Sequence, residues 1–262
     1  MRCSVLLSAT RSVLNGLSQI FLQEHPACGL LVMGTLAVFA PQLLAGALAG
    51  MLGGTLSARW LSDSAADIEA GLYGYNSALL GMLIVQLLGL SPEALQLVLL
   101  LCPLSSLLQH QLLFVMRECG APAVFTLPFV LLGGLTLVCT GIPETQVSNV
   151  PLIGSAGADA ALRAISLGLG QVIFVDHPLA GLGVLLAVSM VNRRAACWAL
   201  CGSAVGVYSA LLINQGATQG LAGMAGAAGF DPALHSGLLV DQPGRSAAAR
   251  AVPTTPGVRV NP

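Results

Sequence analysis

Long apolar runs, separated by short polar stretches, dominate the pattern along this chain. The runs are continuous rather than alternating, which is typical of buried or membrane-embedded helices. Several of them are shorter than the about 20 residues that a straight helix needs to cross a bilayer. Because glycine and proline interrupt the runs, the pattern predicts broken or re-entrant helices around an internal cavity. Apolar spans are expected at 30–52, 77–90, 94–115, 123–140, 179–191 and 195–213.

The composition supports the membrane interpretation. Hydrophobic residues make up 55% of the 262 residues and charged residues only 8%, and the mean hydropathy is +0.85. A soluble domain carries about a quarter of charged residues, because its surface faces water. The predicted fold class is therefore an all-α membrane protein that passes the lipid bilayer several times. The formal net charge of −1 gives no reason to expect a nucleic-acid partner.

Motifs for metal binding or catalysis are missing from the sequence. The chain has seven cysteines but no Cys-x-x-Cys, so neither a zinc site nor a disulfide framework is expected. HExxH, GxSxG and GxxxxGK[ST] are absent as well, which removes common signatures of hydrolases and of nucleotide-binding proteins. We expect no cofactor, no metal and no enzymatic activity.

The sequence contains an internal repeat. GLSQIFLQEHPACGLL (16–31) aligns with GLGQVIFVDHPLAGLG (168–183), which lies 152 residues later. A second pair, GLYGYNSAL (71–79) and GAAGFDPAL (226–234), recurs at an offset of 155 residues. Two motif pairs at nearly the same offset predict an internal duplication. Duplicated membrane folds with broken helices are typical of channels and transporters, whose polar pathway lies at the repeat interface.

The acidic-His-Pro stretches of the repeat predict two helix starts inside the protein. Proline at the first helical position, preceded by polar residues, is typical of a helix N-terminus. Acceptors and negative charge would satisfy the free amides at this positive end of the helix dipole. A metal or proton site is the alternative, because histidine and carboxylate are good ligands, but it needs both halves to converge closely. The half-helix start residues are Glu24, His25, Pro26, Asp176, His177 and Pro178.

Two further histidines, His110 and His235, lie outside this pattern. We expect them at helix ends or in loops.

Both motif pairs resemble those of the urea transporter family, the urea channels of bacteria and vertebrates. Members of that family carry a Gln/Glu-x-x-Phe stretch in each half, which leads into an Asn-Asn-Pro or Asp-Asn-Pro helix start. A Gly-x-x-Gly-Phe/Tyr-Asn motif follows further along each half. QIFLQEHP, QVIFVDHP and GLYGYN match these motifs, and GAAGFD matches less closely. The resemblance covers about residues 12–236.

The resemblance implies a bacterial homotrimer in the inner membrane, in which each protomer holds a pore between two inverted repeats with re-entrant half-helices. It implies passive passage of urea, or a close small amide, through a slot lined by aromatic rings and oxygen acceptors. An aquaporin-like channel for another small neutral solute is the alternative, although the chain has no Asn-Pro-Ala. The implied substrate-binding residues are Gln19, Phe21, Leu22, Tyr75, Leu79, Thr126, Gln171, Phe174, Phe230 and Leu234.

The sequence departs from the family pattern at several positions. Leu22 stands where the family usually has phenylalanine, so one ring of the slot would be missing. His25 and His177 replace an asparagine in each helix start, and Asp231 replaces the asparagine of the second downstream motif. A protonated histidine or an ionised aspartate near the pore would make permeation depend on pH.

The predicted organisation is an N-terminal segment 1–11, a first membrane repeat 12–142, a linker 143–163, a second membrane repeat 164–240 and a disordered tail 241–262. The second repeat is expected to be incomplete, since the counterpart of Thr126 would fall near position 281. The tail is interrupted by proline and poor in apolar residues. A truncated or divergent C-terminal part, with impaired or absent transport, is therefore a further alternative.

Overall fold

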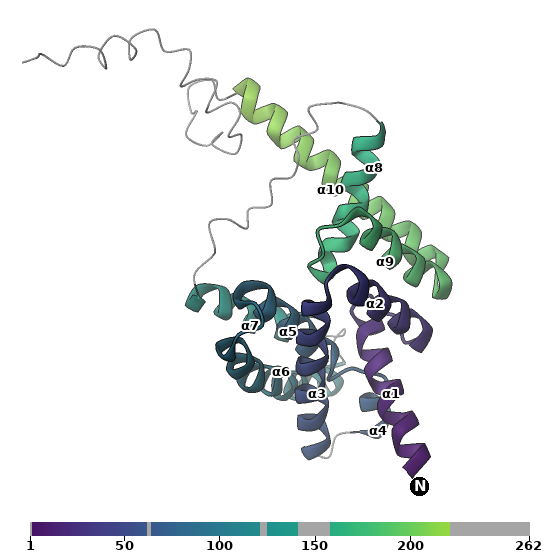
Figure 1. Cartoon of the computed structure of the whole chain (residues 1–262), viewed down its shortest axis with the longest axis vertical. Coiled ribbons are helices and arrows are strands. Elements are labelled where there is room, and N and C mark those ends of the chain that lie inside the picture. Colours follow the sequence, from purple (N-terminus) through teal and green to yellow (C-terminus); the bar gives the residue numbers. More distant parts are fainter. Residues whose placement is uncertain (1, 62–63, 121–124, 141–157, 221–262) are drawn as a thin grey trace, which may run out of the picture. The chain divides into compact units, whose positions relative to one another are not determined.

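The computed structural model describes residues 2–61, 64–120, 125–140 and 158–220. These parts of the chain form helices and no strand (Figure 1), which confirms the all-α prediction. The chain divides into two compact units, Met1–Val207 and Tyr208–Pro262, and the site residues that the structure describes lie in the first. The α-helices are α1 (Arg2–Gln19), α2 (Pro26–Phe39), α3 (Pro41–Trp60), α4 (Ala65–Glu69), α5 (Tyr75–Leu88), α6 (Pro92–Cys119), α7 (Leu127–Thr140), α8 (Ala158–Gly170), α9 (Pro178–Val191) and α10 (Arg193–Gly220).

Glycine allows α3 and α5 to touch through their backbones. A methyl group added at Gly50 of α3 would overlap the carbonyl oxygen of Ser77 in α5. One added at Gly81 of α5 would overlap the carbonyl oxygen of Gly46 in α3. Small residues at such crossings are typical of helices that pack in membranes. The apolar side chains packed in the same core include Leu43, Ala47, Met51, Leu79, Met82 and Val85.

A second kind of close crossing occurs twice, once in each half of the chain. Gly29 of α2 lies against the backbone of Leu14 in α1, and Gly181 of α9 lies against the backbone of Ser166 in α8. At either glycine, an added methyl group would overlap the carbonyl oxygen of the other helix. Both residues of the second crossing lie 152 residues after those of the first, as the sequence repeat predicts.

The turns that precede α2 and α9 also have the same geometry. Leu22 and Phe174 both have left-handed backbone, with φ values of 56° and 58°. The amide of Leu22 donates to the Gln19 carbonyl at 2.9 Å, and the amide of Phe174 donates to the Gln171 carbonyl at 3.0 Å. In the second half this turn includes the short 3-10 helix η2 (Gln171–Ile173). The local fold of the repeated motif thus recurs, whereas the inverted orientation of the halves stays a prediction.

A break between α2 and α3 divides the apolar span that was expected at 30–52. α2 ends at Phe39, Ala40 leaves the helical backbone with φ −152° and ψ 65°, and Pro41 opens α3. Proline lacks the amide hydrogen of a continuing helix and disfavours helical backbone at the residue before it. The prediction of a single span is therefore wrong here, although Pro41 itself carried the signal.

Among the described helices, α6 alone is long and apolar enough to cross a membrane by itself, with 28 residues. The segment Leu162–Ile173, from α8 and η2, passes the same test together with α9 as one broken span, which bends by 72°. The apolar helices α2, α5 and α7 have 14 residues each. At 1.5 Å per residue such a helix is about 21 Å long, whereas the hydrocarbon core of a bilayer is about 30 Å thick.

Candidate functional site

Two histidines cap the helices of the repeated motif. The His25 Nδ1 atom accepts a hydrogen bond from the amide of Ala27 at 3.2 Å, and Pro26 is the first residue of α2. His177 accepts from the amide of Leu179 in the same way, also at 3.2 Å, before α9. Both histidines have extended backbone, as N-cap residues usually do. Each imidazole therefore satisfies one of the free amides at a helix start.

The acidic residues beside these histidines do not provide the capping acceptors. Glu24 and Asp176 are exposed, and the capping hydrogen bonds go to the imidazoles rather than to the carboxylates. The Asp176 carboxylate lies 3.5 Å from the side-chain nitrogen of Gln171, which is itself exposed. No group of three or more metal-ligating side chains occurs in the described part of the chain.

Helices α2 and α9, which begin at the two caps, pack against each other. Gly183 of α9 faces the Thr35 side chain, so that a methyl group there would lie 2.6 Å from its hydroxyl oxygen. The ring of Phe39 at the end of α2 stacks on the His177 ring, with centroids 4.6 Å apart and an interplanar angle of 24°. The two halves of the sequence repeat therefore meet at the helices that their shared motif begins.

Three polar side chains of α1, those of Ser12, Asn15 and Gln19, donate hydrogen bonds to backbone carbonyls at the end of α4. The Ser12 hydroxyl donates to the Ile68 carbonyl at 2.6 Å, and the Asn15 side-chain nitrogen donates to the Glu69 carbonyl at 2.8 Å. The carbonyls at a helix C-terminus have no partner within the helix, so side chains often satisfy them. These contacts hold α4 against α1 just before the 71–79 motif.

Gln19 continues this polar face of α1. Its side-chain nitrogen donates to the Ala70 carbonyl at 3.1 Å. Sequence reasoning singled out Gln19 but missed Asn15, whose Oδ1 atom is buried and has no hydrogen-bond partner in the described structure. Asn15 lies four residues before Gln19 on the same helical face, which is the signal that could have revealed it.

A buried polar network surrounds the 71–79 motif. The side-chain nitrogen of Asn76 donates to Gln109 Oε1 at 3.1 Å and to the Phe125 carbonyl at 3.2 Å. The Tyr75 hydroxyl donates to the same Phe125 carbonyl. Thr126, which follows this carbonyl, is half-buried. Sequence reasoning predicted Tyr75 and Thr126 but missed Gln109, which carries no motif and reveals its role only through the fold.

Some of the predicted aromatic and apolar residues are buried in one core, and others pack against its surface. Tyr75 and Leu79 are buried in it, and Phe21 and Phe174 pack against it. Phe174 also makes an edge contact with Phe129 of α7, with centroids 6.2 Å apart. In this way a residue of the second half reaches the core of the first.

Leu22 lies at the surface rather than in that core. Leu22 occupies the turn equivalent to that of Phe174 and is 59% exposed. Phe230 and Leu234, with the rest of the 226–234 motif, lie outside the described residues.

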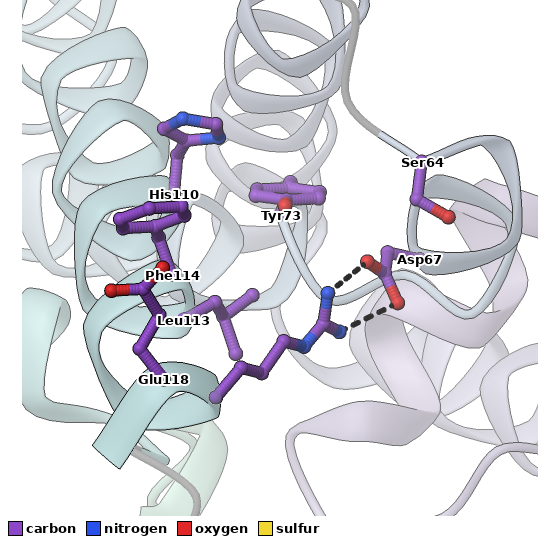
Figure 2. A pocket seen from close by; sticks show the side chains of 8 residues that line it. Ser64, Asp67, Tyr73, His110, Leu113, Phe114 and Glu118 are labelled. Atoms are coloured by element: carbon purple, nitrogen blue, oxygen red, sulfur yellow. Dashed lines mark hydrogen bonds and ion pairs between the residues drawn. The ribbon is translucent and has the colours of Figure 1, made fainter.

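A hollow of about 320 Å³ lies between α4 and the end of α6 (Figure 2). Arg117 donates to both carboxylate oxygens of Asp67, at 2.9 and 3.0 Å, and so ties α6 to α4. His110 lines the hollow from within α6, so its expected place at a helix end or in a loop was wrong. Of the predicted substrate-binding residues that the structure describes, none is in the lining. The described lining residues are Ser64, Asp67, Tyr73, His110, Leu113, Phe114, Arg117 and Glu118.

Comparison with known proteins finds relatives over most of the chain. The family model described as Urea transporter matches residues 10–240. Urea transporter 1 of Mus musculus is 30% identical over 224 residues, which are 79% of this chain and 57% of that protein. Urea transporter 1 of Ovis aries is 29% identical over 219 residues, which are 77% of this chain and 56% of that protein. The chain thus spans somewhat more than half the length of these relatives.

Proposed function

Because the chain belongs to the urea transporter family, we propose that it is a membrane channel that conducts urea, or a close small amide, passively through a narrow slot. The observation that carries this proposal is the family match over residues 10–240. The solute crosses such a channel unchanged, so the proposed activity needs no catalytic residue and no cofactor.

The chemistry of urea suits a slot of this kind. Urea is flat and neutral, and its two amino groups donate hydrogen bonds while its carbonyl accepts them. Aromatic walls exclude thicker solutes, and oxygen acceptors along one edge replace the water that the amino groups lose. Ions are excluded because removing their hydration shell costs far more free energy than a few oxygens return. Binding that stays weak at several successive positions allows the solute to leave.

We assign the walls of the slot to the core that both repeated motifs reach. Tyr75 and Leu79 are buried in that core, while Phe21 and Phe174 pack against it. Thr126 follows the carbonyl that Tyr75 binds. Phe174 supports the assignment most directly, because it comes from the second half and contacts an aromatic ring of the first.

We assign the oxygen acceptors to the glutamines of the repeated motif. Gln19 is fixed by its bond to the Ala70 carbonyl, and its amide oxygen is the acceptor offered to the solute. Gln171 holds the equivalent position 152 residues later.

The proposed architecture has two inverted membrane repeats, 12–142 and 164–240, assembled as a homotrimer in the inner membrane. Its support is the recurrence of the capped helix starts at Pro26 and Pro178 and of the glycine crossings behind them. In duplicated transporters the pathway lies where the repeats meet, and α2 and α9 pack against each other. The bend of 72° between α8 and α9 fits a re-entrant segment.

Proteoliposomes that contain the purified chain test the proposal. After mixing with urea or with glycerol, the rates of volume change are followed by light scattering. We expect urea to enter several-fold faster than it enters empty vesicles, with no comparable gain for glycerol. A gain for glycerol without one for urea would instead support an aquaporin-like channel for another neutral solute.

A further inference from the structure

We propose that Gln109 is a positioning residue for the solute pathway, which acts through Asn76 to hold the turn that carries Thr126. This inference rests on the proposed function, because that function makes Thr126 part of the slot. Gln109 lies in α6, outside both repeated motifs.

Asn76 forms a hydrogen-bonded bridge across the turn at Thr126. One of its amide hydrogens goes to the Phe125 carbonyl, at a nitrogen–oxygen distance of 3.2 Å. Its Oδ1 atom accepts from the Phe129 amide at 3.4 Å, within the first turn of α7. Thr126 lies between these two backbone groups, so the orientation of a single side-chain amide determines the geometry of the turn on both sides.

The backbone of this turn needs such a restraint. Phe125 has a φ of 46°, a left-handed conformation that residues with a side chain rarely adopt. Its carbonyl accepts from both the Tyr75 hydroxyl and the Asn76 side chain. A backbone in a sparsely populated conformation persists only where its surroundings hold it. Here the hydrogen bonds to Phe125 provide that hold.

Gln109 keeps the Asn76 amide in its orientation. Gln109 Oε1 accepts the second amide hydrogen of Asn76, at 3.1 Å, so both hydrogens have acceptors. The two side chains are fully buried, with exposed fractions of 0% for Asn76 and 2% for Gln109. In a buried site an amide hydrogen that loses its acceptor cannot turn to water instead. Removing the Gln109 oxygen therefore favours rotation of the Asn76 amide and release of the turn.

Helix α6 is fixed well enough to transmit this constraint. The Ser106 hydroxyl donates to the Gly54 carbonyl of α3 at 2.8 Å, and the Ser77 hydroxyl of α5 donates to the Cys102 carbonyl at 2.8 Å. Cys102 and Ser106 lie on the same buried face of α6 as Gln109, seven and three residues before it. Gln109 is thus held by a packed helix.

The decisive variant is Gln109→Met, which keeps the length of the side chain but removes its acceptor. Gln109→Glu is the rescue variant, because a carboxyl group in either protonation state still accepts from Asn76. Ser105→Ala is the matched control, since Ser105 is buried one turn earlier on α6 and its hydroxyl has no partner in the described structure. All variants are compared as full-length chains that elute like the wild type in detergent.

Hydrogen exchange of the peptide covering residues 125–140 measures the turn itself. We expect Gln109→Met to speed exchange at the start of α7 at least threefold, and Gln109→Glu and Ser105→Ala to leave it near the wild-type rate. In proteoliposomes, Gln109→Met should lower the ratio of urea to glycerol permeability at least threefold, again with recovery in Gln109→Glu.

A double variant tests the route through Asn76. In an Asn76→Ala background, Gln109→Met should change neither exchange nor selectivity further. Unchanged exchange in the single Gln109→Met variant, or equal effects of Gln109→Met and Ser105→Ala, would overturn the inference. A wild-type chain that passes no urea would contradict the proposed function instead, and the exchange rates would then decide alone whether Gln109 holds the turn.

Discussion

At the scale of single residues, the chain uses histidine where its family usually has asparagine in the helix-start motif. The structure shows that the imidazoles of His25 and His177 still accept a hydrogen bond from the second helical amide. The exchange therefore preserves the capping acceptor. His177 has an additional contact, because its ring stacks on Phe39.

Substitution of the two histidines should separate capping from stacking. Loss of an N-cap costs about 1 kcal/mol, so His25→Ala and His177→Ala should each lower the Tm by a few degrees. His25→Asn keeps an acceptor and should remain close to the wild type. His177→Asn keeps the capping acceptor but loses the ring stack, which should lower the free energy of unfolding by about 1 kcal/mol. Thermal unfolding of the purified protein in detergent measures all four. Equal Tm values for His25→Asn and His177→Asn would show that the stack contributes nothing.

At the scale of helices, glycine sets how the pairs α1–α2 and α8–α9 cross. Gly29 and Gly181 each face the carbonyl of a neighbouring helix, which cannot move aside as a flexible side chain can. Gly34, also in α2, has no atom within 4 Å of the place where a methyl group would be. The three glycines therefore allow a direct comparison of crowded and open positions in short apolar helices.

Substitution by alanine should lower the stability of the protein at Gly29 and Gly181 and raise it at Gly34. Gly29→Ala and Gly181→Ala should separate the crossing helices and cost at least about 2 kcal/mol, because overpacking forces the backbone to shift. Gly34→Ala should stabilise α2 by up to about 1 kcal/mol, because alanine is the better helix former. Thermal unfolding and elution profiles in detergent provide the measurement. A Gly29→Ala variant as stable as Gly34→Ala would refute the close crossing.

The helix scale also shows what the sequence could and could not predict. Pro26 and Pro178 were identifiable because a helix start depends on a few adjacent residues, and the structure begins helices at both. The break at Pro41 was missed because apolar composition hid a local signal. The bonds of Asn76 to Gln109 and Phe125 join residues 33 and 49 positions apart, so no local pattern could have revealed them.

At the scale of the whole molecule, the sequence repeat and the family match both extend over the two halves of the chain. The motif pairs predicted a duplication with a shared pathway, and the structure brings the two capped helices together as α2 and α9. The family match covers both halves, from residue 10 to residue 240. Together they support the proposal of one pathway for a small neutral solute at the junction of the halves.

Uptake of radiolabelled urea into proteoliposomes, measured together with sodium leak in the same vesicles, tests this account most directly. The account predicts that urea permeability rises in proportion to the amount of protein, several-fold above empty vesicles, while sodium leak stays at the level of the lipid alone. A narrow slot must show this separation, because an ion would have to lose its hydration shell to enter it. Urea uptake equal to that of empty vesicles, or a rise in sodium leak parallel to urea uptake, would contradict it.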